Sequence, residues 1–341
     1  MMAGSRLTGA LKFLLFLGIG VLITWLSLRG LSPGDRAHIT ASFREANYFW
    51  VLLVILIGVV SHVLRALRWL MLLRSSGDHP SLKNTFIAVM TGYFANLAFP
   101  RLGEVTRCGV LYTTDNIPVN RSFGTVITER AIDFITFLLM LAGVVALEYR
   151  LLIGYLDRRI FPGLLQKVQA PSEHIGALLV IFGVLLLLAG GVIFVMRSEP
   201  RHTFRFRIRT ILLGFWQGLI SIGKMRRPWL FVVYSLLIWV CYFLMTWITF
   251  RALPQTMHLS LLAGLSVLVM GTFGVMATPG GIGLYPVIAM ETMSLYGIPA
   301  TTGLAMGWII WAAQTLMIIL TGTAALLWLS MLKKRRKEGN L

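Results

Sequence analysis

The sequence has 341 residues, of which 57% are apolar and only 13% charged, and its mean hydropathy is +0.79. So little polar surface cannot cover a water-soluble globule, and we therefore expect an integral membrane protein. The net charge of +18 does not indicate nucleic-acid binding, because the 31 Lys and Arg residues are dispersed between apolar runs. The two cysteines, Cys108 and Cys241, lie far apart and predict neither a disulfide framework nor a metal-ligand cluster.

Six apolar runs are long enough to cross a bilayer, which takes about 20 helical residues. They comprise residues 11–28, 48–73, 123–147, 175–196, 229–252 and 300–330. The first run is longer than a signal-peptide core and no Ala-x-Ala-like site follows it. We therefore expect it to be retained as the first span.

Two further apolar regions are interrupted by helix-breaking residues. Residues 84–112 are broken at Pro100, and residues 259–297 are broken at Pro279 and the glycines that follow it. In both regions the second half is too short to cross a core of about 30 Å at 1.5 Å per helical residue. We predict two re-entrant helical hairpins, each returning to the side it entered.

The positions of Lys and Arg predict the orientation, because cytoplasmic loops collect them. With the amino terminus inside, most of the 31 basic residues fall on the cytoplasmic side. They include Arg65 and Arg68 near the end of the second span and the basic tail at 333–341. We expect a multi-pass protein of the bacterial cytoplasmic (inner) membrane with both termini in the cytoplasm. Three arginines fall within the membrane in this arrangement: Arg101, Arg107 and Arg130.

The two hairpins enter from opposite sides, which is the arrangement of an inverted-topology repeat. The sequence supports this when it is aligned with itself at an offset of 179 residues. Four residues then match identical ones: Gly92, Phe94, Ala98 and Pro100 align with Gly271, Phe273, Ala277 and Pro279. We predict one all-α polytopic membrane domain over residues 1–341, with repeat halves at about 48–147 and 229–330.

Residues 204–223 place six apolar side chains on one helical stripe, with the arginines elsewhere. This pattern predicts an interfacial amphipathic helix on the inner leaflet. The alternative is a simple basic loop that continues into the next span.

Polar residues gather at the first break and at the start of the span that follows. Irregular backbone at membrane depth persists only beside protein or a water-filled cavity, so the two hairpins predict a polar cavity. Its candidate substrate-binding residues are Asn96, Arg101, Glu104, Arg107, Glu129, Arg130 and Asp133. Charges at this depth usually face a bundle interior or a polar pathway. Two roles stay open and can coexist: contact with a ligand, and a closed ion-pair network that holds the hairpin.

The second break is rich in glycine and carries no charge before Glu291. Glycine permits a positive φ and close approach of the backbone, so N–H groups of the turn can face a headgroup phosphate. A role in packing alone is the alternative. The candidate residues here are Pro279, Gly280, Gly281, Gly283 and Glu291.

No pattern of catalytic residues is present in the sequence. The six histidines show no metal-ligand spacing, and neither a serine elbow nor a Walker loop occurs. We expect no catalytic residue, metal or cofactor, and the sequence disfavours an enzymatic role.

Three segments together resemble the lysylphosphatidylglycerol synthase transmembrane (flippase-like) family, and the resemblance covers nearly the whole chain. They are residues 96–107, residues 128–133 and residues 278–283. The resemblance implies a stand-alone membrane domain without the aminoacyltransferase domain, of a kind implicated in moving a modified lipid to the outer leaflet. The family often has an acidic residue just after the Pro-Gly-Gly turn, where this chain has Tyr285 and Pro286. An aminoacylated lipid is therefore not presumed.

The leading hypothesis is a lipid translocator whose cavity receives a polar headgroup while the repeats rearrange. The expected partners are a membrane phospholipid or lipid-linked substrate and anionic lipid headgroups, but not nucleic acid. A membrane-embedded lipid-modifying transferase or accessory subunit is the main alternative, and a coupled solute transporter is the third. Four properties stay open: the identity of the lipid, the direction of its movement, the energy source for that movement, and whether the protein forms a homo-oligomer.

Overall fold

The computed structural model describes residues 18, 20–98, 102–151, 223 and 225–337. Every regular element in this part of the chain is a helix, which confirms the predicted all-α class. The expected span at 175–196, the amphipathic helix at 204–223 except Gly223, and Arg101 lie outside the described residues. The chain forms two compact units, residues 1–126 with 224–341 and residues 127–223.

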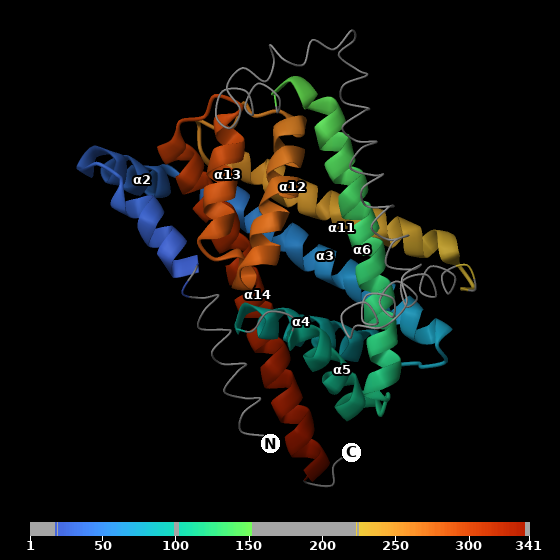
Figure 1. The fold of residues 1–341 in the computed structure, drawn as a ribbon. Coiled ribbons are helices and arrows are strands. Elements are labelled where there is room, and N and C mark those ends of the chain that lie inside the picture. Colours follow the sequence, from blue (N-terminus) through green and yellow to red (C-terminus); the bar gives the residue numbers. More distant parts are fainter. Residues whose placement is uncertain (1–17, 19, 99–101, 152–222, 224, 338–341) are drawn as a thin grey trace, which may run out of the picture. The chain divides into compact units, whose positions relative to one another are not determined.

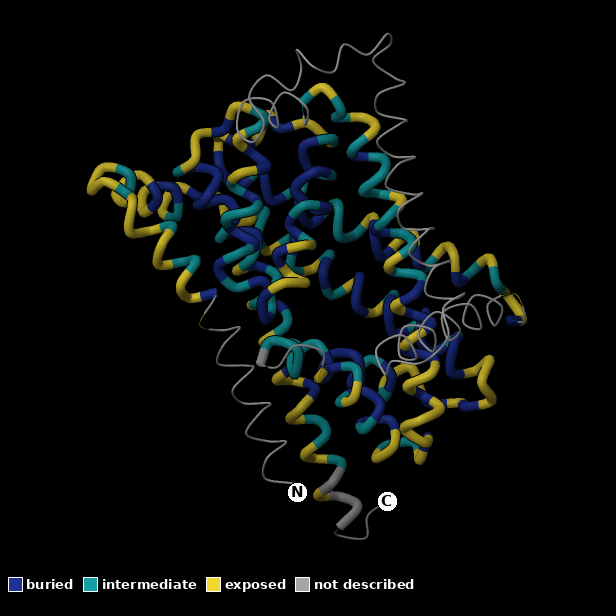
Figure 2. The backbone as a smooth tube through the Cα atoms, in the orientation of Figure 1, coloured by how far each residue is buried: buried dark blue, intermediate teal, exposed yellow. Residues whose placement is uncertain are grey.

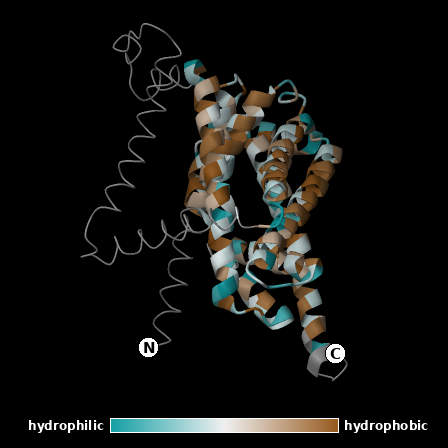
Figure 3. Ribbon diagram, turned by 90° about the vertical axis from the view of Figure 1, so that its right-hand side faces the viewer, coloured by the Kyte–Doolittle hydropathy of each residue, from teal (hydrophilic) through white to brown (hydrophobic). Residues whose placement is uncertain are grey.

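Four helices have the length and composition of membrane spans, as predicted for their segments. They are α3 (Tyr48–Ser75), α6 (Val119–Leu147), α11 (Pro228–Thr249, extended by the 3-10 turn η1, Phe250–Ala252) and α14 (Ala300–Lys337). Figure 3 shows hydrophobic residues along most of the helices of the described chain. On α11, Val232, Leu236 and Val240 are each about half exposed at four-residue spacing. Such a continuous apolar stripe is costly in water and suits contact with lipid.

Helices α3 and α11 pack side by side in the unit that contains both hairpins (Figure 1). The Asn47 side chain accepts a hydrogen bond from the Phe49 amide and caps the start of α3. The Asn47 amide donates to the Ala252 carbonyl at 2.8 Å, so the start of α3 lies beside the end of η1. The pair is therefore antiparallel, and it supports the helices that carry the hairpins.

The first interrupted region forms a helical hairpin of α4 (Leu82–Ala98) and α5 (Leu102–Asp115). At its open end, the Asn84 side-chain amide donates to both Asp115 carboxylate oxygens at 3.1 Å. At its closed end, the Asn96 side-chain oxygen accepts from the Gly103 amide at 2.7 Å. Gly92 and Gly103 face each other. A Cβ added at Gly92 would lie 2.8 Å from the Gly103 carbonyl oxygen. The two helices thus run antiparallel in close contact, and the chain leaves the hairpin beside the point where it entered.

The second interrupted region has the same construction. Helix α12 (Leu261–Ala277) leads through the turn η2 (Pro279–Gly281) into α13 (Leu284–Ser294). The Tyr296 hydroxyl donates to the Ser266 hydroxyl at 2.8 Å and joins the open end. Buried residues concentrate where α12, α13 and α14 pack together (Figure 2).

The closed ends of the two hairpins meet. A Cβ on Gly280 of η2 would lie 3.1 Å from the Leu97 side chain, one residue before the end of α4. The Trp311 indole of α14 donates to the Gly280 carbonyl at 2.8 Å and fixes the turn from another side. The Pro/Gly turn of one hairpin therefore lies against the last turn of the other hairpin's first helix.

One helix was not expected from the sequence, in the segment between the first two predicted spans. Helix α2 (Pro33–Glu45) begins with a capping box between Ser32 and Asp35, and the Ser32 hydroxyl holds the pKa of the Asp35 carboxyl below its usual value. Its residue Ile39 packs against Leu304 and Ala305 of α14. The segment is too polar on average to be recognised as a span. It nevertheless forms a helix, because one of its faces is buried.

Candidate functional site

The predicted polar residues of the first hairpin lie on facing parts of α4 and α5. Asn96 holds the closed end through the Gly103 amide. Glu104 is partly buried and Arg107 is buried, three residues apart on α5. At this spacing the two side chains occupy neighbouring positions on one helix.

The Arg107 guanidinium lies over an aromatic ring. Its Cζ is 4.5 Å from the centroid of the Trp69 ring on α3. Trp69 is fully buried, and its indole N–H donates to the Thr125 hydroxyl at 2.9 Å. A cation over a desolvated tryptophan face is stabilised by about 2 kcal/mol. Residues of α3, α5 and the first turns of α6 thus fix the orientation of Arg107.

The acidic residues of α6 belong to the unit of residues 127–223. Glu129 is buried, Asp133 is partly buried and Arg130 is exposed. Glu129 and Asp133 are four residues apart on α6, so they share a helical face. Their part in ligand contact or in an ion-pair network that holds the hairpin stays a prediction.

The glycines of the second break adopt the conformation expected of them. The φ angles are 58° at Gly280, 77° at Gly281 and 73° at Gly283, values that strain other residues. Several turn amides are bonded within the turn, including the Gly281 amide, which donates to the Thr278 carbonyl at 3.0 Å. This geometry favours packing as the main role of the turn.

Glu291 lies away from the turn. It is exposed and belongs to the last turn of α13. Eight residues separate it from Gly283, which corresponds to about 12 Å along a helix. The carboxylate therefore lies at the other end of α13 from the Pro-Gly-Gly segment. We had grouped the two together because Glu291 is the first charge after that segment.

Two further arginines, interpreted from the sequence as cytoplasmic topology signals, are buried in α3. Arg65 is 3% exposed and Arg68 is 0% exposed, and α3 continues beyond both to Ser75. Arg65 Nη2 donates to the Tyr242 hydroxyl at 2.8 Å, and Arg68 Nη1 donates to the Ser235 hydroxyl at 3.2 Å. Both partners belong to α11, so the two cations lie at the α3–α11 contact.

The spacing of the basic residues on α3 was the signal that could have identified this cluster. His62, Arg65 and Arg68 follow one another at three-residue intervals inside an apolar run, which places them along one side of a helix. The His62 ring packs on the Tyr93 ring of α4 with centroids 4.5 Å apart. The Arg65 guanidinium lies 5.7 Å from the same ring.

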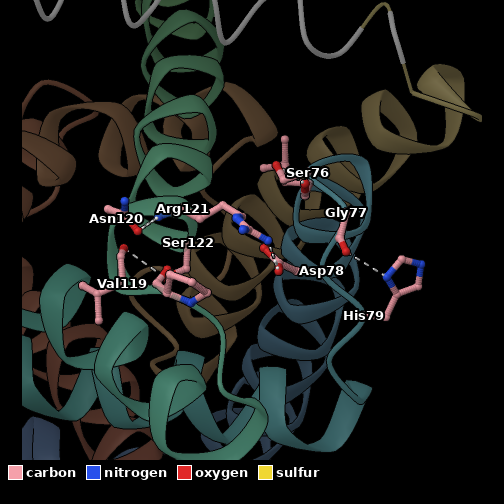
Figure 4. A network of polar contacts seen from close by, with 10 residues as sticks. Ser76, Gly77, Asp78, His79, Val119, Asn120, Arg121 and Ser122 are labelled. Carbon is pink, nitrogen blue, oxygen red and sulfur yellow. Dashed lines mark hydrogen bonds and ion pairs between the residues drawn. The ribbon is translucent and has the colours of Figure 1, made fainter.

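At the open end of the first hairpin, an ion pair joins the loop between α3 and α4 to the first turn of α6 (Figure 4). Arg121 Nη1 lies 2.8 Å from Asp78 Oδ1, with the Arg121 side chain 50% exposed and the Asp78 side chain 9% exposed. The ends of α3 and α5 are thereby held on the same side as the start of α6.

We expect a double-mutant cycle of Asp78→Asn and Arg121→Gln to give a coupling energy of roughly 1 kcal/mol, because the carboxylate is buried while the guanidinium is half solvated. Thermal unfolding in detergent measures it. Arg121→Gln should cost less stability when Asp78 is already neutral. Additive effects of the two changes would show that the pair contributes nothing.

Comparison with known proteins identifies membrane proteins, as the composition predicts. The family model described as the lysylphosphatidylglycerol synthase TM region matches residues 10–322. The UPF0104 membrane protein MJ1595 of Methanocaldococcus jannaschii is 22% identical over 270 residues, which cover 76% of this chain and 79% of that protein. No solved structure matches the chain.

Proposed function

Because the chain belongs to the lysylphosphatidylglycerol synthase transmembrane family, we propose that it is a lipid translocator of the bacterial cytoplasmic membrane. Its cargo is a lipid with a polar headgroup, which crosses through a polar path beside the two hairpins. Family membership and the four apolar helices support a membrane protein with a lipid-related role.

The observation that carries the proposal is the meeting of two interrupted hairpins. The second helices, α5 and α13, have 14 and 11 residues, or about 21 and 17 Å at 1.5 Å per residue. These lengths are shorter than a hydrocarbon core of about 30 Å, so we propose that both hairpins are re-entrant. Broken helices that meet within the membrane are the usual construction of transporter substrate sites.

Helix boundaries support the proposed repeat. Leu82, the first residue of α4, precedes Leu261, the first residue of α12, by the same 179 residues that align the sequence identities. In both hairpins a serine hydroxyl accepts from a backbone amide at this start, Ser81 from Asn84 and Ser260 from Ala263. In our proposal the halves are inverted, both termini are cytoplasmic, and alternate rearrangement of the halves exposes the headgroup to either side.

Reconstitution of the purified chain in vesicles tests the proposal. Lipids of several classes carry a fluorescent headgroup label, and a membrane-impermeant quencher removes the outer-leaflet signal, with and without an imposed proton gradient. We expect faster loss of the inner-leaflet signal than in protein-free vesicles for at least one lipid class. No acceleration for any class under either condition would contradict the proposal.

A further inference from the structure

A cation lies over a tryptophan ring near each end of α3. The Lys83 Nζ atom is 3.4 Å from the centroid of the Trp328 ring. The Arg251 Cζ atom is 3.9 Å from the centroid of the Trp247 ring and 5.8 Å from that of the Trp50 ring. The face of an aromatic ring attracts a cation electrostatically, so each charge is held in a defined place.

The two cations lie at opposite ends of one compact unit. Arg251 belongs to η1, whose Ala252 carbonyl accepts from the Asn47 amide at the start of α3. Lys83 follows the end of α3 at Ser75 by eight residues and belongs to the first turn of α4. Because α3 has 28 residues, or about 42 Å, its two ends lie near opposite faces of a hydrocarbon core of about 30 Å.

The tryptophans beneath the cations lie at the depth of lipid headgroups. Trp328 precedes the end of one candidate span at Leu332 by four residues, and Trp247 precedes the end of another at Ala252 by five. These separations correspond to about 6 and 8 Å along a helix. Tryptophan is enriched at this level, where its ring contacts the headgroup layer. The two cations therefore lie where the phosphates of phospholipids lie.

Both cations keep their hydrogen-bond donors. Lys83 is exposed and Arg251 is partly exposed, and neither makes an ion pair or a side-chain hydrogen bond within the described part of the chain. Asp115, at the same open end as Lys83, accepts from Asn84 instead. An ammonium has three N–H donors and a guanidinium has five, and a ring face attracts the charge without using all of them. Donors thus remain for an anionic oxygen.

Each cation also lies beside the start of a hairpin. Lys83 immediately precedes Asn84, whose side chain joins α4 to the end of α5. Trp247, which holds Arg251, packs on the first turn of α12, because a Cβ added at Gly264 would lie 3.1 Å from the Trp247 Cβ. The two hairpins are therefore each accompanied by one cation, and the two cations lie at different faces of the membrane.

We propose that Lys83 on Trp328 and Arg251 on Trp247 are matched contacts for the phosphate of an anionic phospholipid, one in each leaflet. An anionic lipid is favoured over a zwitterionic one, because the cation of a zwitterionic headgroup competes for the same phosphate. The inference deepens the proposed translocator and rests on it for the passage of lipid between the two contacts. A lipid that crosses leaves one headgroup layer and enters the other, so these contacts hold the cargo at both ends of its path.

Native mass spectrometry of the full chain tests the proposal by counting the lipids that stay bound after release from detergent. The probes are phosphatidylglycerol and phosphatidylcholine with identical acyl chains, supplied in equal amounts. We expect wild type to retain phosphatidylglycerol preferentially. Lys83→Gln and Arg251→Gln should each weaken the binding of one retained phosphatidylglycerol at least five-fold, and the double variant should lose both.

Two other arginines provide matched controls. Arg74 lies in the last turn of α3, at the same end as Lys83, and Arg44 lies in the last turn of α2, just before the residues that bond to η1 near Arg251. Both are exposed, and neither lies over a ring in the described part of the chain. Arg74→Gln and Arg44→Gln remove the same charge from the same ends, so their retention of phosphatidylglycerol should stay within two-fold of wild type.

Variants that keep the charge test the cation over the ring. Lys83→Arg and Arg251→Lys should each retain phosphatidylglycerol within about three-fold of wild type, because either cation is attracted by the ring. Equal losses in the control variants would reduce the effect to general surface charge and overturn the two contacts, as would equal retention of the two lipids. Displacement of the lipid by inorganic phosphate would overturn the assignment to a lipid.

The outcome is separable from that of the vesicle experiment. Retention of phosphatidylglycerol that depends on Lys83 and Arg251, without accelerated lipid movement, would leave the contacts standing and contradict the translocator. Accelerated lipid movement, with retention unchanged in both glutamine variants, would support the translocator and contradict the contacts.

Discussion

Gly103→Ala is expected to destabilise the protein by about 3 kcal/mol, because the added methyl group has no space in the closed end of the first hairpin. A Cβ at Gly103 would overlap the Gly92 carbonyl oxygen and lie 2.7 Å from the Asn96 side-chain amide. The first of these is a backbone atom of the facing helix, so the change must separate α4 from α5. It must also disturb the hydrogen bond that joins Asn96 to the Gly103 amide.

Gly109→Ala provides the matched control on the same helix. Gly109 also lies in α5, but a Cβ there meets nothing within 4 Å. Alanine in a helix interior is favoured over glycine by up to about 1 kcal/mol, so this variant should be at least as stable as wild type. Thermal unfolding in detergent measures both. Similar stability of the two variants would contradict the close α4–α5 contact.

The hairpins were predictable from the sequence because their signals are local. Proline and glycine interrupt an apolar run at Pro100 and at Pro279, and each remaining half is visibly too short to cross. The all-α class and the four long described helices follow from apolar run length in the same way. These predictions needed no knowledge of which helices touch.

The buried arginines of α3 were not predictable from the same rules. Arg65 and Arg68 lie near the end of a span, where basic residues ordinarily mark the cytoplasmic side. What buries them is contact with Tyr242 and Ser235 on α11, which follow about 170 residues later in the chain. Hydropathy predicts where along a membrane span a residue lies. It does not predict which face of the helix is covered by a helix that is distant in sequence.

The same limit applies to the grouping of site residues. Glu291 was grouped with the Pro-Gly-Gly turn because it is the first charge after it, yet α13 places it at the far end of a helix. Sequence proximity is a poor guide once a helix of 11 residues intervenes, since the helix converts eight residues into about 12 Å.

Gly283→Ala is expected to destabilise the protein by about 3 kcal/mol through two separate effects. The φ of 73° costs a residue with a Cβ about 1 kcal/mol. The methyl group would also overlap the Gly20 carbonyl oxygen and lie 2.5 Å from the Thr24 hydroxyl, both on the helix Gly20–Arg29. Because that helix packs directly on the turn of the second hairpin, the second effect should be the larger.

Gly297→Ala separates the two effects. Gly297 has a φ of 83° but nothing within 4 Å of an added Cβ, so this variant carries the conformational cost alone and should lose only about 1 kcal/mol. The difference between the two unfolding free energies in detergent therefore measures the contact between the first helix and the Pro-Gly-Gly turn. Equal losses would mean that this helix does not pack on the turn, and the turn would then be held by Trp311 and α4 without it.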